Sequence, residues 1–129
     1  MSKVIRARGD HVVMSFEHAS VVNTDTTFKL MKAARKMVLE KVDYYNLTGL
    51  AANGSNFVAI SLRKSSTDMT TPRATSSTGL TADAFTDLPV STTPANTRLA
   101  ENDELTFFVD CTGTVTLPAG RVIVQARYA

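Results

Sequence analysis

LTFFVD, residues 105–110, and RVIVQARY, residues 121–128, are the two stretches that decide the fold. In each of them apolar side chains alternate with more polar ones, which is the period of a β-strand buried on one face. Burying one such side chain stabilises the folded state by ~1.5–3 kcal/mol, so the apolar face needs a cover from elsewhere in the chain. The inward-facing set is Leu105, Phe107, Val109, Val122, Val124, Ala126 and Tyr128.

The connector between these strands favours a reversal of the chain. Residues 111–114 (CTGT) and 117–120 (LPAG) contain glycine and proline, which are typical of turns. We therefore expect the two strands to pair antiparallel with each other. Their cover is expected to be a second long hairpin, formed by residues 37–46 and 57–64, which carries Val58, Ile60 and Leu62 on its inner face.

The N-terminal residues also predict strands. Residues 3–8 and 11–16 fit a short hairpin around Gly9-Asp10, because Val12, Met14 and Phe16 form an apolar face. The same segment is compatible with an arm that reaches out to a neighbouring subunit. Both interpretations stay open at this point.

Residues 25–45 carry two competing patterns. Apolar residues from Phe28 to Tyr45 recur at spacings of three and four, which fits a helix, whereas the β-branched and aromatic residues of 37–46 fit a strand. We predict two strands, residues 27–32 and 37–46, with Val38, Val42 and Tyr44 on one inner face. Glu40 then points inward as well, which requires a β-bulge or an edge position.

Residues 65–97 have a different composition from the rest of the chain. Of these 33 residues, 15 are Ser or Thr, three are Pro and four are charged. A segment of this length without periodicity predicts a functional loop or a disordered one, and its low charge argues against a fully solvated linker. Residues 81–85 predict one helical turn capped by Thr81, and the apolar residues Leu80, Phe85, Leu88 and Val90 indicate packing on the domain or on a partner.

The composition predicts one globular domain over residues 1–129, with an arm or strands in 1–25 and a long loop in 65–98. Its 14 basic and 12 acidic residues give a net charge of +2, which indicates neither nucleic-acid nor membrane binding. No apolar run approaches ~20 residues, and no signal peptide is expected from the N-terminal residues. The lone Cys111 cannot form an intramolecular disulfide.

Residues with catalytic or metal-binding chemistry are few. Asp10-His11 and Glu17-His18 offer ligand types, but a spacing of seven on a strand puts the two histidines on opposite faces. No Ser or Cys nucleophile, phosphate loop or carboxylate pair stands out. We therefore expect no enzyme activity, no metal and no cofactor.

Three short motifs have simpler explanations. Residues 8–10 (RGD) match an integrin-binding tripeptide but fit a turn, and residues 46–48 (NLT) match a glycosylation sequon in a chain without an expected secretion signal. An aromatic platform for sugar or single-stranded nucleic acid is conceivable; its members would be Tyr44, Tyr45, Lys41 and Arg63. We favour Tyr44 as a core residue and Tyr45 as a surface or subunit-interface residue.

Three segments together resemble a known family. Residues 38–50 running into 56–62, then 99–107 and 117–124, follow one another as in the jelly-roll or β-sandwich capsid cement (decoration) proteins of tailed phages. The resemblance covers about half of the chain and favours strands in the ambiguous region. It implies an all-β, antiparallel β-sandwich of jelly-roll type with a long Thr/Ser-rich loop and an N-terminal arm.

The resemblance also implies a function. Such a protein binds the outside of the capsid, bridges neighbouring copies of the major capsid protein, and forms a homodimer or homotrimer; it would be made in the bacterial cytoplasm and end in the virion. The family shares no short contact motif, so we predict contacts from the arm and the loop, where exposed backbone can extend a neighbour's sheet. The predicted contact residues are Lys3, Val4, Ile5, Arg6, Arg8, Thr70, Thr71, Arg73, Phe85 and Leu88.

Two other functions remain open. A phage tail or spike module would bind a host-surface glycan through the loop and Tyr44/Tyr45. A catalytic β-sandwich would depend on His11, His18 or Cys111, and is the weaker of the two.

Overall fold

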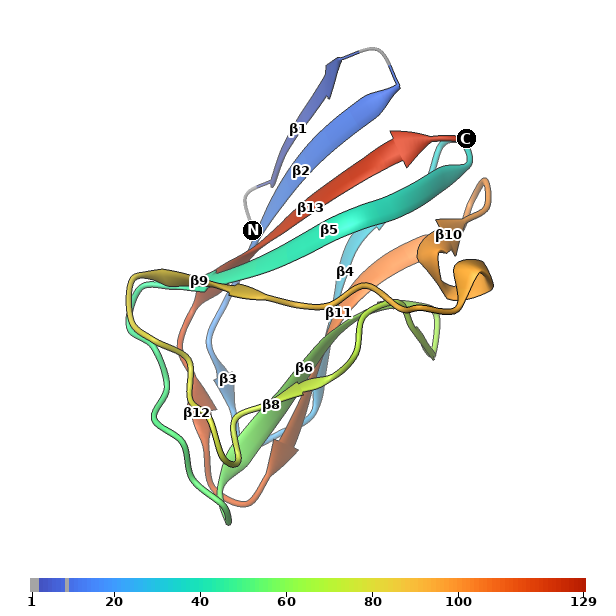
Figure 1. Ribbon diagram of the computed structural model, residues 1–129. Coiled ribbons are helices and arrows are strands. Elements are labelled where there is room, and N and C mark those ends of the chain that lie inside the picture. Colours follow the sequence, from blue (N-terminus) through green and yellow to red (C-terminus); the bar gives the residue numbers. More distant parts are fainter. Residues whose placement is uncertain (1–2, 9) are drawn as a thin grey trace.

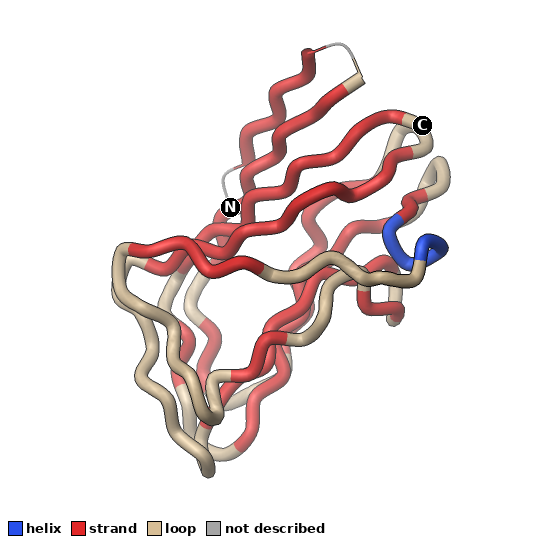
Figure 2. Tube along the Cα trace, in the orientation of Figure 1, coloured by secondary structure: helices blue, strands red, loops and turns tan. Residues whose placement is uncertain are grey.

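The computed structural model describes residues 3–8 and 10–129, and this part of the chain is almost entirely β (Figure 2). It contains no α-helix, and no helix in it could span a membrane. The long strands are β1 (Lys3–Arg8), β2 (His11–His18), β4 (Thr26–Lys32), β5 (Met37–Asn46), β6 (Phe57–Lys64), β11 (Glu104–Thr112) and β13 (Gly120–Tyr128). The short elements are β3 (Val21–Val22), β7 (Thr67–Asp68), β8 (Arg73–Ala74), β9 (Ala84–Asp87), the 3-10 helix η1 (Pro94–Thr97), β10 (Arg98–Leu99) and β12 (Thr116–Leu117).

Two antiparallel sheets face each other across one apolar core (Figure 1). The larger sheet has the order β1-β2-β13-β5-β10, with β9 also paired to β5. The smaller sheet has the order β4-β11-β6-β7, with β8 also paired to β6, and a separate two-stranded ribbon joins β12 to β3. The predicted all-β antiparallel sandwich is therefore confirmed.

Two of the three predicted hairpins, residues 105–128 and 37–64, are wrong, because the strands of each pair lie in different sheets. β11 pairs with β4 and β6, whereas β13 pairs with β2 and β5. Likewise β5 belongs to the larger sheet and β6 to the smaller one. The Gly- and Pro-containing connectors carry the chain across the core and not back along the same sheet. A strand that faces its partner across a core has the same alternation as one that pairs beside it, so the pattern could not separate the two arrangements.

The core is where the two predicted apolar faces meet. Leu105, Phe107 and Val109 of β11 and Val122 and Val124 of β13 are fully buried. Phe107 lies at the centre, with its ring centroid 5.6 Å from that of Tyr44 and 5.2 Å from that of His18. The apolar faces therefore cover each other.

Strand β5 contains a β-bulge at Glu40. The bulge was one of the two possibilities predicted for Glu40, but the predicted inward position of Val38 is wrong. Opposite Gln125 and Ala126 of β13 stand Lys41 and Leu39, so Glu40 is the extra residue, and its side chain is exposed. Because of this extra residue, the alternation of buried and exposed side chains changes at Glu40. Leu39 is buried in place of Val38, which is only half-buried and does not share the inner face as predicted.

The N-terminal hairpin forms as predicted, while Ser2 of the arm and Gly9 of the turn lie outside the described residues. β1 pairs with β2 from Lys3 opposite Phe16 to Arg8 opposite His11. Among the described strands β1 has no second neighbour, so it forms an outer edge of the larger sheet (Figure 1).

The segment 65–97 closes one side of the sandwich. It starts at the smaller sheet, where β7 and β8 pair with β6, and ends at the larger one, where β9 and β10 pair with β5 (Figure 2). Met69, Leu80 and Leu88 of this segment are buried. The predicted packing of part of this loop on the domain is confirmed.

The helical turn predicted for residues 81–85 does not form. Residues 84–87 are strand β9, in which Phe85 stands opposite Tyr45. The amide of Asp83 donates to the carbonyls of Asn46 and Leu47. Pairing with the free edge of β5 satisfies more backbone groups than one isolated turn could.

We predict that Phe107→Ala destabilises the protein by ~3–5 kcal/mol, because the removed ring leaves a cavity between the sheets. Urea unfolding measures the loss. Val22→Ala, at a position 55% exposed, is the control and is expected to change stability by less than about 0.5 kcal/mol. Equal effects of the two substitutions would contradict the central position of Phe107.

Candidate binding site

One row of side chains crosses four neighbouring strands of the larger sheet. Arg121 of β13 stands opposite Glu17 of β2 on one side and Tyr45 of β5 on the other, and Tyr45 stands opposite Phe85 of β9. Directly opposite residues point to the same face of a sheet. Because the next residues, such as His18 and Tyr44, are buried, this row faces outward. It covers three strand spacings, roughly 14 Å.

The row has a charged end and an aromatic end. Arg121 Nη2 donates to Glu17 Oε1 over 2.7 Å, and both side chains are about half exposed. The ring centroids of Tyr45 and Phe85 are 5.3 Å apart with an interplanar angle of 48°. Phe85 is 66% exposed, although it is a large apolar residue held in a strand.

A hollow of about 480 Å³ lies over this row. This volume falls within the ~300–1,000 Å³ of typical small-molecule pockets. Besides the four residues of the row, its lining consists of His18, Leu47, Ala119, Gly120 and Ile123.

Gly120, which lines the hollow, lies tightly against the residues beneath it. A Cβ atom at this position would lie 2.5 Å from the Tyr44 hydroxyl and 2.7 Å from the Tyr45 carbonyl oxygen. Both distances are too short for any side chain, so glycine is required here.

A buried hydrogen-bond network supports the row from beneath. His18 Nδ1 donates to the Ala19 carbonyl (2.7 Å), so in the neutral ring Nε2 accepts from the Tyr44 hydroxyl (2.6 Å). Asn46 Nδ2 donates to the same hydroxyl (3.1 Å) and to the Pro118 carbonyl (2.8 Å). Burial lowers the pKa of His18 and raises the pKa of Tyr44, so both stay neutral near pH 7.

This network also explains the sequon at residues 46–48. Asn46 is buried, and its Oδ1 accepts from the amides of Thr48 and Gly49 while its Nδ2 donates to two partners. Both polar atoms of the Asn46 side-chain amide are thus used for hydrogen bonds within the fold, so the residue has a structural role.

The rim of the hollow is fixed by a second polar contact. The Tyr45 hydroxyl donates to the carboxylate of Asp83, and this hydrogen bond is the main cause of the raised pKa of Tyr45. Tyr45 therefore presents a neutral hydroxyl. Its oxygen can still accept a hydrogen bond from a ligand.

Four of the predicted contact residues in 65–97 serve mainly the fold. Thr70 is buried and accepts from the Leu62 amide (3.0 Å), and Leu88 is fully buried. Arg73 is half-buried and donates to the carbonyls of Thr78 and Gly79. Thr71 is exposed, but its amide donates to the Pro89 carbonyl. Among the predicted residues of this segment, Phe85 presents by far the largest exposed apolar surface.

The predicted contact residues of the arm all lie in β1. Val4 and Ile5 are each 47% exposed. Lys3, Arg6 and Arg8 belong to the same strand, of which the structure describes the backbone but not these three side chains.

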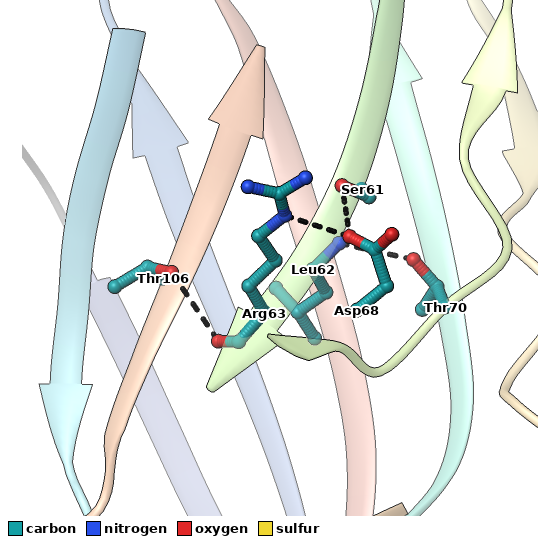
Figure 3. A network of polar contacts seen from close by, with 6 residues as sticks. All are labelled: Ser61, Leu62, Arg63, Asp68, Thr70 and Thr106. Atoms are coloured by element: carbon teal, nitrogen blue, oxygen red, sulfur yellow. Dashed lines mark hydrogen bonds and ion pairs between the residues drawn. The ribbon is translucent and has the colours of Figure 1, made fainter. Parts of the chain in front are cut away.

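Polar contacts near Arg63 hold the start of the long segment and exclude the aromatic platform that was considered as an alternative from the sequence. Arg63 Nε lies 2.7 Å from Asp68 Oδ1, which also accepts from the Ser61 hydroxyl (Figure 3). Arg63 therefore belongs to the smaller sheet, where its guanidinium covers the ring of Phe108. It does not join Tyr45, so the platform of Tyr44, Tyr45, Lys41 and Arg63 is not assembled.

The predictions on Tyr44, Tyr45, His11 and His18 agree with the structure. Tyr44 is in the core and Tyr45 on the surface; His11 is exposed, whereas His18, on the other face of β2, is buried. Cys111 is half-buried at the end of β11. In the described part of the chain, no three potential metal ligands come together.

No family model matches the chain, and no curated protein or solved structure matches it significantly. The row across β2, β13, β5 and β9 is therefore interpreted from its own geometry. Sequence reasoning found Tyr45 and Phe85 separately, considered Glu17 only as a metal ligand and missed Arg121, because only the strand register brings the four together.

We predict that stability falls with pH below about 6.5, the ordinary pKa of histidine. In that range the unfolded chain binds a proton at His18, whereas the folded protein keeps the buried ring neutral, so protonation favours unfolding. Urea unfolding between pH 7.5 and 5 measures this dependence. It should be weaker in His18→Asn than in the control His11→Asn, at an exposed histidine of the same strand; identical slopes would contradict it.

Proposed function

We propose that this protein is a non-enzymatic structural protein of a tailed phage that binds the outer surface of the capsid and cements neighbouring major capsid protein subunits. The observation that carries the proposal is the open edge of β1, with Val4 and Ile5 each nearly half exposed. The resemblance of the sequence to capsid cement proteins supplies the biological setting. In this setting the protein is made in the host cytoplasm and ends on the capsid exterior.

An open strand edge is a docking element by its chemistry. Its backbone N–H and C=O groups can pair with an extended segment of another chain, which gives affinity through main-chain hydrogen bonds. By sequence β1 also contributes three basic residues, so a partner segment with acidic residues would be favoured.

The inner face beside this edge is incompletely covered. Ile5 stands opposite Met14 of β2 and, with Met31 of β4, lines a cavity of about 180 Å³. The smaller sheet ends at β4, while the larger sheet continues to β1. A partner segment that pairs with β1 and also covers this inner face would bury the side chains that the smaller sheet leaves exposed.

Cementing does not require each contact to be strong. An oligomer that binds several capsid subunits at once gains avidity from the high effective concentration of its other sites. A homodimer or homotrimer is therefore part of the proposal. The proposal also includes the jelly-roll type of the sandwich, which the resemblance to cement proteins implies.

A second candidate function is a tail or spike module that binds a host-surface glycan. The hollow over Tyr45 and Phe85 is the observation that favours it. The two functions differ in copy number, because cement proteins cover the shell whereas tail modules occur in small fixed sets.

We predict a copy number comparable to that of the major capsid protein in purified particles of the phage that encodes this chain. Quantitative mass spectrometry against the capsid protein measures the ratio. A handful of copies per particle would contradict cementing and favour the tail module. Absence from the particles would contradict both.

We predict that Ile5→Asp reduces binding to capsids that lack the protein at least tenfold, because the carboxylate places a charge in the interface of β1. Co-sedimentation with such capsids measures binding. The control is Val22→Asp, which adds the same charge at an exposed position outside β1. Undiminished binding of folded Ile5→Asp would rule out β1 as the contact.

A further inference from the structure

We infer that the row of Glu17, Arg121, Tyr45 and Phe85 is a carbohydrate-binding site that takes a neutral hexose or N-acetylhexosamine ring. The site lies on the outer face of the larger sheet, whereas the proposed capsid contact lies at the edge of β1. The inference deepens the second candidate function, glycan binding at the same hollow, by naming the class of sugar, and it does not depend on capsid binding.

The aromatic end of the row suits the apolar face of a sugar ring. Phe85 is 66% exposed, and its position is fixed by strand pairing with β5 and by the ring of Tyr45 at 5.3 Å. A rigid, exposed aromatic ring provides a large apolar contact at little cost in conformational entropy. The C–H groups on one face of a pyranose can stack against it.

The charged end suits the hydroxyl groups of the same ligand. The ion pair uses Arg121 Nη2 and Glu17 Oε1, and within the described part of the chain neither Arg121 Nε and Nη1 nor Glu17 Oε2 makes another hydrogen bond. Both side chains are about half exposed. Donors and an acceptor thus lie side by side, which matches neighbouring sugar hydroxyls, since each hydroxyl can both donate and accept.

The charge balance selects a neutral ligand. Arg121 and Glu17 compensate each other, and the carboxylate of Asp83 lies at the rim, bonded to Tyr45. Lys41, on the same face, is already paired with Asp43 and Asp87. With no uncompensated positive charge among these residues, an acidic sugar or a phosphate would be repelled, whereas a neutral hexose would not.

The site is also held in shape before a ligand arrives. Its four residues come from four hydrogen-bonded strands, and Gly120 and the His18–Tyr44 pair lie directly beneath. A preorganised site loses less entropy on binding than one built from mobile loops.

The test is a chemical-shift titration of the isotope-labelled protein with glucose, galactose, mannose and N-acetylglucosamine. We expect saturable shifts with at least one of these sugars at the amides of residues 17, 45, 85 and 121. Phe85→Ala should weaken that binding at least tenfold, while Phe85→Tyr keeps the stacking ring and should bind within threefold of the original protein.

Arg121→Gln tests the polar end independently and should weaken binding at least fivefold. Val22→Ala is the matched control, an exposed apolar truncation away from the row, and should leave binding unchanged. The inference is overturned if none of the four sugars causes saturable shifts at the row, or if binding persists in Phe85→Ala. It is equally overturned if Phe85→Ala abolishes capsid binding and no sugar binds, since the row would then be a protein contact.

Discussion

The structure depends on the burial of the apolar face of β11 against the larger sheet across the core. Phe107 is the centre of this contact, where it stacks on Tyr44 at 5.6 Å between ring centroids and lies beside His18. Neither sheet can bury its apolar face without the other, so the core exists only where the two sheets pack together. The strands of the larger sheet are thereby fixed relative to one another, and with them every residue on its outer face.

Much of the fold could be predicted because side-chain alternation is a local property. It located the long strands to within two residues at each end. For Glu40 it required either a bulge or an edge position, and the structure contains the bulge. The pairing could not be predicted in the same way. The inward-facing residues of β11 show the same alternation whether its partner strand lies beside it or across the core. The hairpin of residues 105–128 was therefore predicted from the turn residues alone, and it was wrong.

The candidate site was beyond the sequence for a related reason. The row consists of Glu17, Tyr45, Phe85 and Arg121. Each lies 28 to 40 residues from the next along the chain, so no sequence spacing indicates that they come together. Register brings them into one row, and a slip of a single residue in any strand would turn its member into the core. Only the exposed Phe85 carries a local signal, as an apolar residue in a polar segment.

The buried network couples this row to the core. His18 and Tyr44 point inward from the positions next to Glu17 and Tyr45, so the same strand residues that pack on Phe107 hold the outer row from below. Gly120 leaves no space for adjustment, because any Cβ would strike the Tyr44 hydroxyl and the backbone of Tyr45. A change in packing at Phe107 would therefore act on the floor of the hollow, whereas the edge of β1 is separated from β5 by two strands, β2 and β13. The proposed sugar site and the proposed capsid contact can for this reason be altered separately. Substitutions in the core or the row would change the sugar site, and substitutions in β1 would change the capsid contact.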